Sequence, residues 1–110
     1  MSSMFADLTS RARKASDLAL TDVAEQLTGM FRDHLYQHGV PVNEIKSCSI
    51  VHDPESSRFV PDITPRVSEM DLGSPTSPPM GLVVKFFNRI NVPKMHNAAL
   101  YAASKKVGLL

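Results

Sequence analysis

The sequence TDVAEQLTGMFRDHLYQHG, residues 21–39, combines the strongest periodicity in the chain with chemically specified ends. At 100° per residue its apolar side chains fall on one arc of a helix, and its charged side chains fall on the other side. Asp22 with Glu25 resembles a capping box, and Gly39 followed by Pro41 is typical of a helix stop. The pattern predicts an amphipathic helix. Its apolar arc contains Leu20, Val23, Leu27, Met30, Phe31 and Leu35.

The segment before this helix has an apolar repeat of its own. Residues 4–20 contain no Gly or Pro, and apolar residues recur at alternating spacings of three and four, as in a heptad repeat. Either one helix runs from about Met4 to His38, or two helices meet near Thr21. A single helix of that length has an apolar seam that the rest of the chain is too short to cover, which predicts a dimer; a broken helix allows a hairpin within one monomer. We expect the long or gently broken helix and self-association through Phe5, Leu8, Ala12, Val23, Leu27 and Met30.

The middle of the chain has the signals of extended structure. Residues 45–52 (IKSCSIVH) and 58–64 (RFVPDIT) predict two strands that flank a turn. Pro61 lacks a backbone donor, so the second strand is expected at a sheet edge or as an irregular extended segment. Residues 67–72 are too short to assign beyond one helical turn.

The last third begins with a stretch rich in Pro, Gly and Ser, residues 73–81 (GSPTSPPMG), which is typical of a linker. Residues 82–87 (LVVKFF) form the most strand-like run in the chain. Residues 91–107 predict a helix with Asn91 as its N-cap and a stop at Gly108.

These elements predict one α+β domain over residues 1–110. We expect a helical arm over 1–39, strands and loops over 40–72, the linker over 73–81, and a strand plus a C-terminal helix over 82–110. The sheet is predicted to be a small antiparallel or mixed sheet of two to three strands. Because the chain has no Trp and only 6% aromatic residues, the core is modest, and self-association is a common remedy for a modest core.

Composition limits the chemistry and the location that the sequence favours. A single cysteine, Cys48, excludes an internal disulfide and a Cys-rich zinc site. No apolar run approaches 18 residues, and the N-terminus lacks the apolar block of a signal peptide. We therefore expect a cytoplasmic protein with no membrane association, and the sequence gives no motif for a cofactor.

The distribution of charge is uneven although the net charge is only +1. Residues 1–71 hold seven basic and all eleven acidic residues, a net of −4, whereas residues 72–110 hold five basic residues and no acidic ones. This polarity fits an internal match between two parts of one fold, a contact between copies, or an anionic partner. For the last of these, the candidate nucleic-acid contacts are Lys85, Arg89, Lys94, Tyr101, Lys105 and Lys106.

His34 and His38 lie four residues apart in the apolar arc of the first helix. A pair at this spacing can share a metal ion, and a buried pair can respond to pH. The ordinary alternative is structural: a hydrogen bond for His34 and a favourable helix-dipole position for His38. A metal site needs further ligands, and the sequence lacks the HExxH pattern, so we expect no metal.

The sequence contains little that favours catalysis. Cys48 and His52 are about 13 Å apart if they lie on one strand, and Asp53 with Asp62 is explained by turn chemistry. No phosphate-binding loop or dinucleotide fingerprint is present. We expect a small non-enzymatic protein that self-associates, with nucleic-acid binding as the alternative, while a cleft holding His52 beside Asp62 or Cys48 would favour an enzyme.

Overall fold

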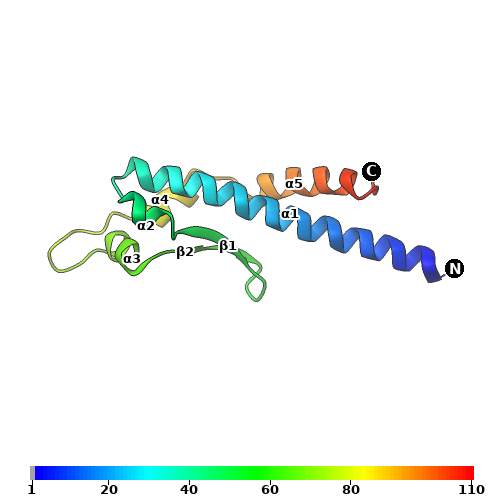
Figure 1. Ribbon diagram of the computed structural model, residues 1–110, viewed down its shortest axis with the longest axis horizontal. Coiled ribbons are helices and arrows are strands. Elements are labelled where there is room, and N and C mark those ends of the chain that lie inside the picture. Colours follow the sequence, from blue (N-terminus) through cyan, green and yellow to red (C-terminus); the bar gives the residue numbers. More distant parts are fainter. Residues whose placement is uncertain (1) are drawn as a thin grey trace. The chain divides into compact units, whose positions relative to one another are not determined.

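The computed structural model describes residues 2–110, with side chains from Met4 onward. The chain is α+β, as the sequence predicts, with a long N-terminal helix, an antiparallel pair of strands and a C-terminal helix (Figure 1). In chain order the elements are α1 (Ser2–Gln37), α2 (Val42–Ile45), β1 (Ser49–Asp53), β2 (Arg58–Asp62), α3 (Pro65–Leu72), α4 (Leu82–Asn88) and α5 (Val92–Lys106).

Helix α1 is a single helix of 36 residues. The cap-like Asp22 does not interrupt it, because no Pro lies in the helix and the backbone hydrogen bonding continues through this position. The helix ends where the sequence predicts: Gly39 has a φ of 82°, and the N–H of Val40 donates to the carbonyl of Leu35 at 3.1 Å. This left-handed stop satisfies carbonyls that the helix leaves unpaired.

From Ala15 to Leu35 the buried apolar residues of α1 recur every four residues, so the heptad spacing of residues 4–20 does not continue along the helix. Each step of four residues turns 40° around the helix axis, so the buried row winds around α1. Met30, placed in the apolar arc by the sequence, lies off this row and is 42% exposed. The buried row consists of Ala15, Ala19, Val23, Leu27, Phe31 and Leu35, each at most 1% exposed.

Strands β1 and β2 form an antiparallel hairpin in which Ile50 lies opposite Pro61. The side chain of Thr28 on α1 accepts the N–H of Ile50 at 2.9 Å and donates to its carbonyl at 3.1 Å. The backbone groups of Ile50 therefore point away from β2, and the ladder needs no N–H from Pro61 at this position. The first strand begins at Ser49 rather than at residue 45, because α2 occupies the chain up to Ile45.

The strand predicted over residues 82–87 is wrong: this run is helix α4. Its start is fixed from outside the run, by Gly81 in the left-handed region and by the Asp71 carboxylate, which accepts the N–H of Val83 at 2.9 Å. Leu82 and Phe86, four residues apart, are buried. Tertiary contacts thus override the β propensity of the sequence.

The Pro- and Ser-rich stretch over residues 73–81 contains neither a helix nor a named strand. Ser74 and Ser77 exchange backbone hydrogen bonds of 2.8 and 3.2 Å in a tight turn. The N–H groups of Met80 and Gly81 donate to carbonyls at the end of α3. The stretch is therefore hydrogen-bonded at both its turn and its end, and α3 over Pro65–Leu72 is longer than the single turn considered from the sequence.

The chain divides into two compact units. The first unit combines the part of α1 up to Val23 with Val92–Leu110, and the second unit is Ala24–Asn91. Both units share α1, but the second contains the hairpin, α2, α3 and α4.

Candidate functional site

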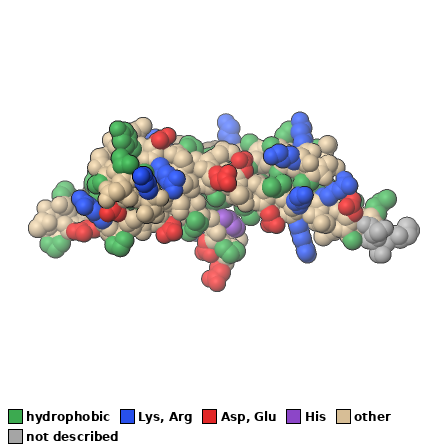
Figure 2. Space-filling model, viewed as in Figure 1, with side chains coloured by type: hydrophobic (Ala, Val, Ile, Leu, Met, Phe, Trp, Pro, Cys, Tyr) green, Lys and Arg blue, Asp and Glu red, His purple; other side chains and the backbone are tan. Residues whose placement is uncertain are grey.

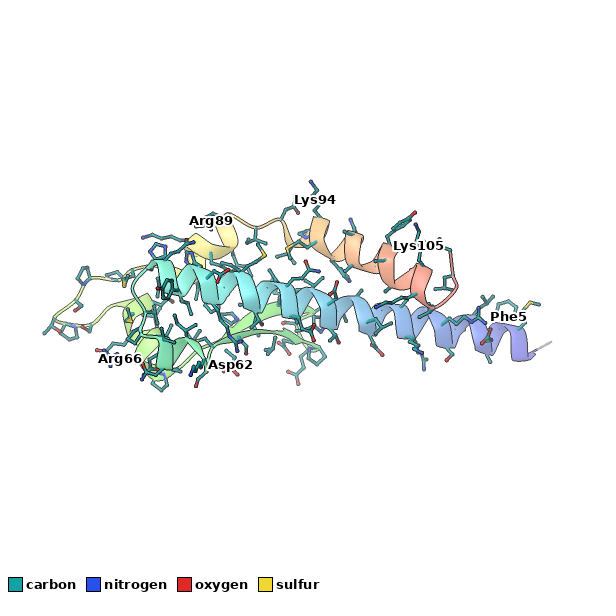
Figure 3. The ribbon with its side chains drawn as sticks, turned by 45° about the horizontal axis from the view of Figure 1, so that its top comes forward. Phe5, Asp62, Arg66, Arg89, Lys94 and Lys105 are labelled. Atoms are coloured by element: carbon teal, nitrogen blue, oxygen red, sulfur yellow. The ribbon has the colours of Figure 1, made fainter. Side chains whose placement is uncertain are left out.

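In the first unit, α5 lies beside the first part of α1 and runs in the opposite direction (Figures 1 and 3). Apart from Val23, the buried side chains described in this unit are alanines: Ala15 and Ala19 on α1, and Ala99 and Ala103 on α5. Small side chains allow two helix backbones to approach closely. A Cβ on Gly108 would lie 3.2 Å from Nη1 of Arg11, so the residues that follow α5 lie beside Arg11.

The first turns of α1 extend past this point and have no cover from α5 (Figure 3). Met4 is 72% exposed, Phe5 77% and Leu8 48%, and Ala12 is exposed as well. Figure 2 shows apolar side chains uncovered at this end of the unit. We call Met4, Phe5 and Leu8 the N-terminal apolar patch.

The N-terminal apolar patch belongs to the same heptad seam that α5 covers farther along α1. Phe5 and Ala19 are fourteen residues apart, and Leu8 and Ala15 are seven apart, so each pair occupies equivalent heptad positions. The seam is buried at Ala15 and Ala19 and exposed at Ala12 and at its large side chains, Phe5 and Leu8. The large apolar side chains of Phe5 and Leu8 are therefore exposed to water, and a further helix packed on the seam would cover them.

The six residues predicted for self-association fall into two groups. Phe5, Leu8 and Ala12 are exposed, and Met30 is partly exposed, but Val23 and Leu27 are fully buried within the chain. The two buried residues are therefore unavailable to a second copy while the chain is folded. The alanine-rich face of residues 91–107 was the signal in the sequence that another helix covers part of the seam.

The predicted nucleic-acid contacts also divide between the units. The first unit holds four of them on α5: Lys94, Tyr101, Lys105 and Lys106. The second unit holds Lys85 on α4 and Arg89 directly after it. The Nζ atom of Lys105 lies 4.6 Å from the centre of the exposed Tyr101 ring, a cation–π distance. Helix α5 contains no acidic residue, and Lys and Arg side chains stand out over this unit in Figure 2.

His34 and His38 are brought together as the sequence predicts, with ring centres 4.5 Å apart. His34 is 1% exposed, and its Nε2 donates to the carbonyl of Leu82 on α4 at 2.8 Å. Burial, with smaller contributions from the positive charges of His38, Arg89 and Lys85, lowers the pKa of His34 below 6.5, while the bond to Leu82 acts in the opposite direction. Among the described residues no group of three or more His, Cys, Asp or Glu side chains is arranged to hold a metal ion.

The pairs considered for catalysis are not brought together. The Cys48 side chain is buried and donates to the carbonyl of Glu44 at 3.4 Å, while the His52 ring packs against Phe59. Asp53 and Asp62 lie at opposite ends of the hairpin.

The Asp53 carboxylate stabilises the turn after β1. It accepts the Ser56 hydroxyl at 2.7 Å and the N–H of Glu55 at 3.1 Å, and these bonds, with that to Ser56 largest, lower its pKa. A shallow pocket of about 160 Å³ is lined by Arg66, Glu69, Met70, Ser74 and Ser77 and contains none of the predicted site residues.

Two further findings bear on function. Within residues 2–110, no helix has both the length and the apolar character needed to cross a bilayer. Comparisons with protein-family models, with curated proteins and with solved structures give no match for this chain.

Proposed function

We propose that the protein is a small non-enzymatic assembly protein whose copies associate through the N-terminal apolar patch on α1. The observation that carries this proposal is the exposure of Phe5 and Leu8 on a seam whose later residues, Ala15 and Ala19, are buried within the same chain. A second copy supplies the same apolar side chains, so an isologous contact between the two patches covers both. The free, buried thiol of Cys48 agrees with a reducing, cytoplasmic location.

The association is expected to be weak and dependent on concentration. Three large side chains from each copy bury less than the roughly 1,200 Å² that stable interfaces require. The neighbouring ion pair between Arg11 and Asp7, at 3.1 Å, is exposed and contributes little to such a contact. Dimers should therefore form at high protein concentration and dissociate on dilution.

Leu8→Asp should remove this self-association without unfolding the chain. A carboxylate in the N-terminal apolar patch loses its hydration when two copies meet, and two such charges repel each other. Because Leu8 is 48% exposed, the fold itself should be little affected. Light scattering over a concentration series measures the mass, and circular dichroism checks the helix content.

The matched control is Ser10→Asp, which introduces the same carboxylate on the opposite face of the same exposed part of α1. This variant should associate as the wild type does. Equal masses for Leu8→Asp and the wild type at every concentration, with the wild type dimeric, would exclude the patch as the interface.

A second candidate function is binding of a single-stranded nucleic acid by α5. It is favoured by the exposed Tyr101 ring, on which a base can stack, beside Lys105 on a helix without acidic residues. Binding of labelled RNA or DNA should weaken steeply with salt, and replacing Lys105 and Lys106 by Ala should reduce the salt slope by about 2. Replacing the exposed Lys46 and Arg58 of the other unit removes the same charge and should leave the slope unchanged. Equal slopes for both variants would reject the α5 site.

A further inference from the structure

The imidazole of His34 joins two helices that are far apart in the sequence. Its Nε2 is 2.8 Å from the carbonyl oxygen of Leu82, the first residue of α4. Because a carbonyl only accepts, Nε2 must carry the proton, and in the neutral ring Nδ1 is then an unprotonated acceptor. The ring also packs near Phe86, with centres 5.5 Å apart, so the second part of α1 and α4 meet around this histidine.

The other ring nitrogen of His34 has no partner. Nδ1 is buried and makes no hydrogen bond with any described residue. A proton added there would create a buried N–H without an acceptor, which is costly.

The charged groups that act on His34 would oppose such a proton. They are His38 just after α1, Lys85 on α4 and Arg89 just after α4, and all three are basic. On α3, the carboxylate of Asp71 is engaged at the start of α4 by the N–H of Val83. Protonated His34 would thus be a buried cation among positive charges, and no carboxylate of the described residues is among the groups that act on it.

We propose that His34 is a pH switch: protonation at Nδ1 in mildly acidic solution weakens the contact between α4 and the second part of α1. The neutral ring holds the helices together, and the charged ring favours states in which solvent reaches it. This device is independent of the N-terminal apolar patch, since it lies in the other compact unit.

The lowered pKa of His34 decides whether stability rises or falls with pH. In the unfolded chain His34 titrates near 6.5, and in the folded chain it titrates below that value. Between the two values the unfolded chain binds more protons, so stability decreases as the pH falls. The contribution of neutral His34 to stability is complete above pH 6.5. It is lost as the pH falls from 6.5 towards the pKa of His34 in the folded chain.

Denaturant unfolding between about pH 8 and pH 5 tests the switch. His34→Gln is the matched variant, because its amide can donate to Leu82 and does not titrate. As the pH falls below 6.5, the unfolding constant of the wild type should rise by up to tenfold per pH unit relative to that of His34→Gln. Parallel pH profiles for the two proteins would overturn the proposal.

Proton NMR of the wild type provides a test that does not depend on the variant folding. The ring signal of His34 should titrate with a midpoint below 6.5, and the amide signals of α4 should change at the same midpoint. In His38→Gln, which lacks the adjacent imidazole, the midpoint should rise. A midpoint at or above 6.5 in the wild type, or α4 signals that do not follow His34, would overturn the proposal.

Discussion

Leu27→Asp is expected to abolish the cooperative unfolding transition of the second compact unit. Leu27 is fully buried in the middle of the row that α1 contributes to the core. Removing a buried Leu side chain costs about 2–5 kcal/mol, and burying a carboxylate in its place costs several more. The sum is comparable with the roughly 5–15 kcal/mol stability of a typical domain. Urea unfolding followed by circular dichroism should therefore show no folded baseline.

Leu18→Asp makes the same substitution on the same helix, at a residue that is 38% exposed. There the carboxylate keeps contact with water, so a cooperative transition should persist. If both variants retained such a transition with similar midpoints, the burial of Leu27 would be contradicted. The comparison also shows why Leu27, unlike Leu8, is unsuitable for testing self-association: its substitution removes the fold together with any interface.

Phe86→Ala should destabilise the protein by about 3–5 kcal/mol, as truncation of a buried Phe generally does. Phe86 is 1% exposed, and its ring lies 5.1 Å from that of Phe31 in an edge-to-face arrangement. The substitution leaves a cavity between α4 and α1 and removes an aromatic contact of about 0.5–1.5 kcal/mol. Chemical denaturation at neutral pH, where His34 is uncharged, measures the change.

Phe87→Ala is the neighbouring control on α4. Its side chain is only half-buried, so truncation loses less apolar contact and leaves a site that solvent partly fills. A smaller loss of stability is expected than for Phe86→Ala. The opposite order would mean that α4 presents its other face to α1, and the strand predicted over residues 82–87 would have to be considered again.

Elements whose periodicity and end residues lie within the element or beside it were predictable from the sequence. Helix α1 has a continuous period, and Gly39 specifies its end through a backbone conformation that favours glycine. The hairpin is bounded by turn residues, and Gly108 ends the last helix with a φ of 80°. In each case the residues that determine the structure lie within the element or next to it.

Features that depend on distant residues were not predictable. LVVKFF has high β propensity, yet it becomes helix α4 because Asp71 caps it and His34 anchors its first carbonyl. Sequence periodicity likewise cannot say how far α5 extends along α1. That distance decides which seam residues are covered. The sequence therefore could not show that Phe5 and Leu8 are exposed while Val23 and Leu27 are buried within the chain.

Sedimentation equilibrium of the wild-type protein over a wide concentration range tests the central proposal most directly. If the N-terminal apolar patch joins two copies, the average mass should rise with concentration from that of one chain towards twice that value. Dilution should reverse the rise, as expected for a small interface. A mass that stays at one chain up to the highest concentration would contradict self-association, and the exposed Phe5 and Leu8 would then have another role.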